Sequence, residues 1–157
     1  MKTFKVYVDT SVFGGVFDDE FKNGSRSFFD LVRAGRFELQ ISDVCRKEIA
    51  GAPEDVRAFF DSVIAYLEVV PIDERVLQLR DAYVSAGVVG KRWLDDASHV
   101  AAAVVSGSEL IVSWNFRHIV HFEKIRHYNQ VNTRMGYREI EIRSPLEVLD
   151  YEDEEAV

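Results

Sequence analysis

Apolar positions along the chain fall into two patterns, one typical of buried strands and one typical of amphipathic helices. Short runs that are continuously apolar or alternate with polar residues predict strands at 4–9, 37–41, 69–70, 110–113 and 139–142. The run at 110–113 has no polar face, as expected for a strand covered on both sides. The last run is expected to form an edge strand.

Helical spacing fills the segments between these strands. From Pro53 onward, apolar residues follow the i, i+3, i+4, i+7 rule, at Val56, Phe59, Phe60, Val63, Ile64 and Leu67. Ser25 and Ser42 are predicted N-caps, and Gly14 with Gly15 is expected to interrupt regular structure after the first strand. The other predicted helices cover 25–34, 42–49, 76–87, 95–106 and 121–135, with a short helical turn at Pro145.

The order of the predicted elements indicates the fold class. Strands alternate with one or two helices from the first strand to the last, which predicts an α/β domain with a mostly parallel central sheet and helices on both faces, a three-layer α/β/α arrangement. In open parallel sheets, ligands bind beyond the carboxyl ends of the strands. Polar residues at those ends are therefore the first candidates for function.

Length and composition add a single-domain expectation. A chain of 157 residues is long enough to bury its own core, and we expect one domain over residues 1–149. Its one cysteine, Cys45, excludes an internal disulfide and fits a reducing compartment. No apolar stretch has the length of a membrane span or of a signal-peptide core, so a cytoplasmic protein with no membrane partner is expected.

Charge is distributed unevenly. From residue 147 to the end there are six acids and no bases, which leaves 19 bases against 21 acids in the rest of the chain and predicts an acidic C-terminal tail over 150–157. Residues 114–143 carry six bases against three acids. That stretch is either a solvated helical face or a phosphate-binding surface, with Arg117, Lys124 and Arg126 as the bases nearest the acids described next.

Several acids stand where predicted strands end or predicted helices begin. Asp9 ends the first strand, Asp95 and Asp96 open a helix, and Asn115 follows the strand that ends at 113. Glu48 lies on a helix able to reach the same side of the sheet. Each acid also has an ordinary explanation: Asp9 can cap the next element, two acids at a helix start suit the helix dipole, and Glu48 fits a solvated helix face.

Taken together, these oxygen-bearing side chains predict a metal site. Converging carboxylates repel one another unless a cation lies between them, and carboxylates are the ligands that Mg²⁺ and Mn²⁺ prefer. The four histidines are too scattered to form a zinc site. A magnesium ion held in this way lowers the pKa of a bound water and stabilises charge on a phosphoryl group, so hydrolysis of phosphodiester bonds is the expected chemistry.

Four segments carry a specific resemblance. They are VYVDTSV (6–12), ISDVCRKEI (41–49), LDDASHVAAA (94–103) and LIVSWNFRHI (110–119). In order and spacing they resemble the four motifs of PIN-domain nucleases, and most of all the VapC-type toxins of toxin-antitoxin pairs. The resemblance extends over residues 4–149 and implies a PIN-like fold.

What the resemblance implies is a Mg²⁺-dependent endoribonuclease in which Mn²⁺ can substitute. Asp9, Glu48 and Asp96 match the acidic metal-site positions. Asn115 stands where an acid is common, which favours a single tightly held ion, and it is carried as a fourth catalytic candidate. Asp95 is assigned to the helix start or to a position outside the ligands. RNA is the implied substrate, a cognate antitoxin the implied partner and a homodimer the implied assembly. The candidate substrate-binding residues are Thr10, Ser11, Ser113, Arg117 and His118.

Other readings stay open. A phosphatase that forms an aspartyl-phosphate would need a second Asp two residues after Asp9, where Ser11 stands. A catalytically silent PIN-like module that binds RNA or protein fits the replacement of an acid by Asn115, and a nuclease of housekeeping RNA processing fits the same motifs as a toxin does. For His99 we expect a half-buried ring bonded to a backbone carbonyl, and for His118 either a phosphate contact or a structural bond.

Overall fold

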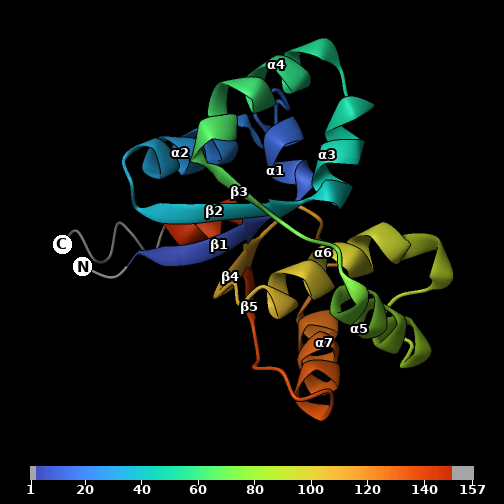
Figure 1. The fold of residues 1–157 in the computed structure, drawn as a ribbon. Helices are drawn as coiled ribbons and strands as arrows, with labels where there is room; N and C mark the ends of the chain where they lie inside the picture. The colour runs from blue at the N-terminus through green and yellow to red at the C-terminus, as the bar shows by residue number, and fades with distance from the viewer. Residues whose placement is uncertain (1–2, 150–157) are drawn as a thin grey trace.

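The computed structural model describes residues 3–149 and has a five-stranded, wholly parallel sheet at its centre (Figure 1). The strand order is β3-β2-β1-β4-β5. Val6 in β1 lies opposite Leu39 of β2 and Leu110 of β4, so β1 is central. The strands are β1 (Phe4–Val8), β2 (Phe37–Ser42), β3 (Leu67–Val70), β4 (Leu110–Val112) and β5 (Glu141–Arg143). The predicted edge strand is β5.

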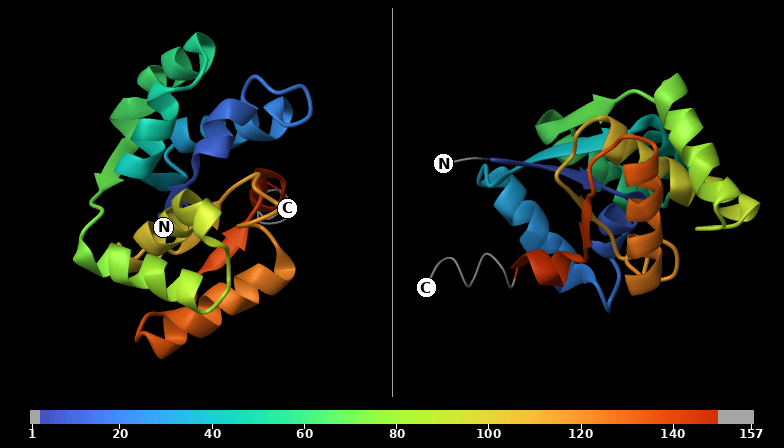
Figure 2. Two further views of the ribbon diagram at one scale, coloured as in Figure 1. Left: turned by 90° about the vertical axis from the view of Figure 1, so that its right-hand side faces the viewer. Right: turned by 90° about the horizontal axis from the view of Figure 1, so that it is seen from below.

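Helices cover both faces of this sheet, which confirms the predicted three-layer α/β/α class. Figures 1 and 2 show α1 to α4 on one side and α5 to α7 on the other. The first layer contains α1 (Thr10–Gly15), α2 (Lys22–Arg33), α3 (Asp43–Ala50) and α4 (Glu54–Val63). The second contains α5 (Glu74–Ser85), α6 (Leu94–Val105) and α7 (Phe122–Arg134). Two 3₁₀ turns are η1 (Ile64–Tyr66) and η2 (Lys91–Trp93), and a helical turn covers 145–149.

The pleat of β1 divides the core in two. Val6 and Val8 join one buried cluster with the aromatic residues of the first helical layer, whereas Tyr7 points to the opposite face and joins the second cluster. In that second cluster α6 contributes a run of small residues, which lets the helix lie close to the sheet: Ala97, Ala101, Ala102 and Ala103. A tyrosine is thereby placed under the carboxyl end of the sheet, next to α6.

The structure departs from the predicted elements in the region of α1 and α2. Gly14 and Gly15 lie inside the short helix α1 rather than interrupting the chain. A Cβ on Gly15 would come within 2.5 Å of Ser25 Oγ and 2.7 Å of Trp114 Nε1, so close approach accounts for this glycine. Ser25 is not a cap, because α2 begins earlier; its hydroxyl donates to the Val12 carbonyl and accepts from Trp114 Nε1.

Two further boundaries are corrected. The helix predicted from Pro53 to Leu67 ends at Val63, and Leu67 already belongs to β3, whose pairing with β2 prevails over the helical pattern. Ser42 precedes α3 as expected, but its side chain makes no cap bond and lies 2.8 Å from the Tyr7 hydroxyl instead. No helix within residues 3–149 is long and apolar enough to cross a membrane. The predicted acidic tail at 150–157 lies outside the described residues.

Candidate active site at the carboxyl edge of the sheet

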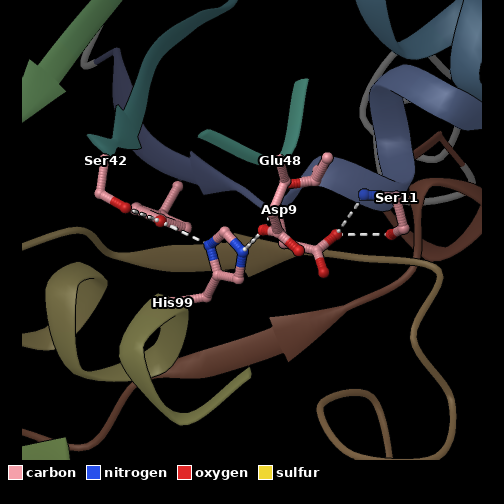
Figure 3. Close-up of polar contacts among 7 residues, drawn as sticks. Asp9, Ser11, Ser42, Glu48 and His99 are labelled. Atoms are coloured by element: carbon pink, nitrogen blue, oxygen red, sulfur yellow. Dashed lines mark hydrogen bonds and ion pairs between the residues drawn. The ribbon is translucent and has the colours of Figure 1, made fainter. Parts of the chain in front are cut away.

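Asp9 occupies the end of the central strand, where β1 turns into α1. As the N-cap of α1, its Oδ1 accepts hydrogen bonds from Ser11 N at 3.1 Å and from Ser11 Oγ at 2.5 Å (Figure 3). Only 4% of Asp9 is exposed. Burial raises the pKa of Asp9 above its ordinary value, and repulsion from Asp96 adds to this, whereas His99 and the hydroxyls of Ser11 and Ser113 partly offset it.

Glu48 reaches the same edge from α3. Its Oε1 atom lies 2.8 Å from Thr10 Oγ1, which donates to it, and 2.6 Å from His99 Nε2. Burial alone would raise the pKa of Glu48, but the hydrogen bond and charge of His99, with help from Thr10, outweigh burial and lower the pKa. Glu48 is therefore ionised near neutral pH, with 35% of its side chain exposed.

Asp96 approaches from the first turn of α6, on the other side of the sheet from α3. Burial raises the pKa of Asp96, and the charge of Glu48 adds to the rise. His118, His99 and a hydrogen bond from the Asn115 side chain act in the opposite direction. The Asn115 Oδ1 atom is already engaged, because it accepts from His118 N at 2.9 Å. Asn115 thus presents its NH₂ group to Asp96, as a donor rather than an oxygen ligand.

A cavity of about 400 Å³ opens beside these acids, a size typical of ligand pockets. Glu48, Asp95, Asp96 and Asn115 line it together with a basic and aromatic group consisting of Arg92, Trp93, Arg117 and His118. Asp9 is not a lining residue, in keeping with its deeper burial. The cavity therefore joins carboxylates that suit a cation to guanidinium groups that suit an anion.

The chemistry of the three acids fits a divalent metal ion. Within residues 3–149 the only ion pair made by Asp9, Glu48 or Asp96 is that of Glu48 with His99, so no lysine or arginine neutralises the group. Burial and mutual repulsion raise the pKa values of Asp9 and Asp96. A bound cation would act in the opposite direction, because it favours the ionised carboxylates. The side chains do not form a finished ligand set, because the described residues contain no group of three or more Asp, Glu, His or Cys placed to hold a metal as they stand.

His99 differs from its prediction. The ring is almost fully buried, with 1% exposed, and it contacts two side chains rather than a backbone carbonyl: Nδ1 lies 2.7 Å from the Tyr7 hydroxyl and Nε2 faces Glu48. Burial lowers the pKa of His99, but the bond to Glu48 and the charges of Asp9, Glu48 and Asp96 outweigh it and raise the pKa. His99 is thus a partner of the acids.

His118 is also placed differently from a free phosphate contact. Its ring is stacked on Trp93, with centroids 4.2 Å apart, and 7% of the residue is exposed. Neither ring nitrogen has a hydrogen-bond partner among the described residues, and both are buried. Burial lowers the pKa of His118, although Asp96 opposes the change, so the ring is neutral. His118 therefore lines the cavity as a neutral ring packed against Trp93.

Of the three bases predicted to lie nearest the acids, only Arg117 lines the cavity. Lys124 Nζ donates to the Val88 carbonyl at 2.9 Å, and Arg126 packs over the Phe122 ring, so neither lines the cavity. Arg117 does line it, and so does Arg92, which lies outside the predicted basic stretch at 114–143. Their guanidinium carbons lie 5.5 Å and 5.7 Å from the centre of the Trp93 ring, as expected for cation–π contacts.

The hydroxyl groups predicted to touch substrate are engaged with the protein. Thr10 donates to Glu48, and Ser11 donates to Asp9 while its oxygen accepts from Trp114 N at 2.9 Å. Ser113 Oγ accepts from Asn115 N at 2.9 Å and its side chain hydrogen-bonds Asp9. These three residues brace the acids in position.

Comparisons with known proteins find solved structures that share the fold of this chain. No family model matches the sequence, and no curated protein matches it. A chain of VapBC2 from Rickettsia felis, solved bound to a promoter DNA fragment, has a TM-score of 0.59 and 12% identity, covering 90% of this chain and 98% of that one. A chain of FitAB bound to the IR36 DNA fragment has a TM-score of 0.58 and 11% identity, covering 89% and 94%.

A third structure, FitAcB from Neisseria gonorrhoeae, has a TM-score of 0.57 and 12% identity, covering 90% of this chain and 98% of that chain. The chain has a PIN-like fold. This confirms the fold that the four motifs predict. In this fold Asp9 follows β1, Glu48 lies on α3, Asp96 lies on α6 and Asn115 follows β4.

Two residues at the cavity that were not predicted, Arg92 and Trp93, had only their nearness to Asp96 in the sequence as a signal. Arg92 and Trp93 come four and three residues before Asp96, in the turn that leads into the PIN-like helix α6. His99 comes three residues after Asp96 and so lies close to it around the helix. Its contact with Tyr7 across 92 positions had no sequence signal, because it arises from the packing of α6 on β1.

Proposed function

We propose that this protein is a Mg²⁺- or Mn²⁺-dependent endoribonuclease that acts as the toxin of a toxin-antitoxin pair. The observation that carries the proposal is the convergence of Asp9, Glu48 and Asp96 at the carboxyl edge of a PIN-like sheet, beside a cavity that Arg92 and Arg117 also line. This arrangement combines the ligands of a hard cation with two groups that bind phosphate.

Each residue has a distinct task in the proposed reaction. Asp9, Glu48 and Asp96 would hold the ion, which when bound supplies an activated water and stabilises charge on the phosphoryl oxygens. Arg92 and Arg117 bind phosphates of the RNA, and Trp93 holds both guanidinium groups at the cavity. Asn115 donates to Asp96 and fixes the orientation of its carboxylate. Since Asn115 adds no charge, one ion is the proposed stoichiometry.

The partners belong to the proposal as well. Similar folds occur in VapBC2 and FitAB, which were solved as complexes with DNA. By analogy we assign this chain a protein antitoxin as its cognate partner, RNA as its substrate, and a homodimer as its assembly. A toxin and a housekeeping nuclease can be told apart by expressing the protein without its partner. A toxin is expected to arrest growth under this condition, and a housekeeping nuclease is not.

Cleavage of RNA by purified protein tests the activity. A 5′-labelled single-stranded RNA should be cut internally with Mg²⁺ or Mn²⁺, remain intact with EDTA, and remain intact with Asp9→Asn or Asp96→Asn. The matched control is Asp43→Asn, an exposed carboxylate of α3 paired with Arg46, and this variant should cut normally. Absence of both cleavage and Mn²⁺ binding in the wild-type protein would favour the catalytically silent module instead.

A further inference from the structure

A chain of buried polar contacts extends from the proposed metal site into the core. The Ser42 hydroxyl lies 2.8 Å from the Tyr7 hydroxyl, and that hydroxyl lies 2.7 Å from His99 Nδ1. On the far side of the ring, His99 Nε2 lies 2.6 Å from Glu48 Oε1 (Figure 3). The chain links β2, β1, α6 and α3, and Ser42, Tyr7 and His99 are all buried.

The direction of one bond in this chain is fixed by chemistry. An ionised carboxylate can only accept hydrogen bonds. His99 Nε2 must therefore carry a hydrogen atom and donate a hydrogen bond to Glu48. Burial raises the pKa of Tyr7 well above its ordinary value, so the Tyr7 hydroxyl keeps its proton and can donate to Nδ1 while it accepts from Ser42. If the ring is doubly protonated, the bonds among Ser42, Tyr7 and Nδ1 reverse. In both cases Nε2–H faces Glu48.

The bonds to Glu48 are unevenly distributed between its two oxygens. Thr10 Oγ1 and His99 Nε2 both donate to Oε1. No hydrogen bond to Oε2 is made within the described part of the chain, and Glu48 lines the cavity. One oxygen is therefore held by the protein while the other is left for a ligand.

We propose that His99 and Tyr7 are positioning residues for the metal ligand Glu48. His99 clamps Oε1 and thereby presents Oε2 to the cation, and Tyr7 holds the imidazole in the orientation that this clamp requires. The inference rests on the proposed function, because it needs a metal ion at this site. Partners of ligating carboxylates generally matter for affinity, since their loss typically weakens metal binding about 10- to 100-fold.

Two substitutions of His99 separate positioning from simple core stability. The amide nitrogen of Gln reaches the place of Nε2 and can still donate to Glu48, whereas the shorter amide of Asn reaches only the place of Nδ1. Both variants lose the buried ring and its contact with Tyr7. Calorimetric titration of RNA-free protein with MnCl₂ should show His99→Asn weakened about 10- to 100-fold and His99→Gln retaining more of the wild-type affinity.

Tyr7→Phe removes only the hydroxyl from the chain. Its matched control is Tyr83→Phe. This variant also deletes a fully buried hydroxyl, which donates to the side chain of Asn132 in α7. Tyr7→Phe should weaken Mn²⁺ binding, less than His99→Asn does, whereas Tyr83→Phe should leave it unchanged. In metal-free protein, the ¹⁵N shift of His99 Nδ1 should change in Tyr7→Phe and not in Tyr83→Phe.

The possible results distinguish this inference from the proposed function. If wild-type protein binds no Mn²⁺, the metal site fails and the positioning role fails with it. If wild-type protein binds Mn²⁺ and folded His99→Asn and Tyr7→Phe bind it equally well, only the positioning role is overturned, and the buried chain serves stability alone. Equal weakening in His99→Gln and His99→Asn would overturn the assignment of Nε2–H as the group that acts on Glu48.

Discussion

Asp9 shows at the scale of a single residue how the site departs from what stability alone would favour. It is a carboxylate with 4% exposure, it has no arginine or lysine partner within residues 3–149, and it lies near a second acid, Asp96. Two hydrogen bonds from Ser11 and one from Ser113 compensate in part. An ionised carboxylate is unfavourable here without a cation beside it, which is typical of residues kept for function.

The cost of the ionised Asp9 predicts a pH-dependent gain in stability for Asp9→Asn. Because burial raises the pKa of Asp9, the folded protein holds this proton to higher pH than the unfolded chain, so stability from the proton is complete below the unfolded pKa and is lost as pH rises through the folded pKa. The Asn oxygen can still accept from Ser11. In EDTA, Asp9→Asn should melt at higher temperature than wild type at pH 7.

The difference in melting temperature should shrink as the pH is lowered, because wild-type Asp9 then takes up its proton. Differential scanning fluorimetry across a pH series measures it, and about 1 kcal/mol corresponds to roughly 2–4 °C for a domain of this size. A variant that melts below wild type at pH 7 would mean that the hydrogen bonds around Asp9 outweigh the cost of its charge.

At the scale of elements, the strands and the longer helices were predictable, whereas the short helix α1 was not. Strands such as β4 are buried on both faces, so their sequences are continuously apolar and easily recognised. Helix α1 has only six residues, two of them glycine, and at Gly15 it packs closely against Trp114 and Ser25. Ser25 was predicted as a cap because serine often begins helices. Its hydroxyl instead makes tertiary contacts with Val12 and Trp114, which no local pattern reveals.

The close approach at Gly15 predicts opposite effects for two adjacent substitutions. Gly15→Ala places a methyl group against Ser25 Oγ and the Trp114 ring and should cost about 1–3 kcal/mol of unfolding free energy. Gly14→Ala meets no atom within 4 Å and should be neutral or stabilising by roughly 0.5–1 kcal/mol, because alanine loses less conformational entropy in a helix. Urea denaturation of both variants decides. Equal effects would contradict the packing account of α1.

The site had a similar division between what sequence could and could not predict. Asp9 and Asp96 stand at element ends, which the pattern of strands and helices locates directly. Arg92 belongs to η2, a 3₁₀ turn without a sequence pattern of its own, and its role depends on Trp93 stacking against His118. Lys124 and Arg126 were predicted from charge alone, and their contacts with Val88 and Phe122 leave neither of them lining the cavity.

Salt dependence of RNA binding tests the revised pair of arginines. For single strands, each phosphate contact contributes about −0.7 to the slope of log affinity against log salt concentration. In an Asp9→Asn background, where RNA stays intact, Arg92→Gln and Arg117→Gln should each flatten that slope by about this amount. Arg126→Gln is the matched control and should leave it unchanged. Flattening by Arg126→Gln alone would place the RNA on α7 instead.

At the scale of the whole molecule, the proposed ion lies between two helical layers, at the place where α3 of one layer contacts α6 of the other. Glu48 comes from α3 in one layer, Asp96 from α6 in the other, and Asp9 from the end of the central strand (Figure 1). A hydrogen bond already joins the two layers here, from His99 of α6 to Glu48 of α3. An ion bound by all three carboxylates would strengthen this link between the two halves of the core.

This coupling predicts that metal stabilises the entire chain and not merely the site. A ligand that binds only the folded state at 100 times its Kd adds about 2.7 kcal/mol, equivalent to roughly 5–10 °C in melting temperature for a domain of this size. Saturating Mn²⁺ should raise the melting temperature of wild type by that amount and slow amide exchange in both α3 and α6. Asp96→Asn, which removes the ligand of one layer, should lose most of the shift. An equal shift in Asp96→Asn, or slower exchange confined to α3, would show that the ion does not connect the two layers.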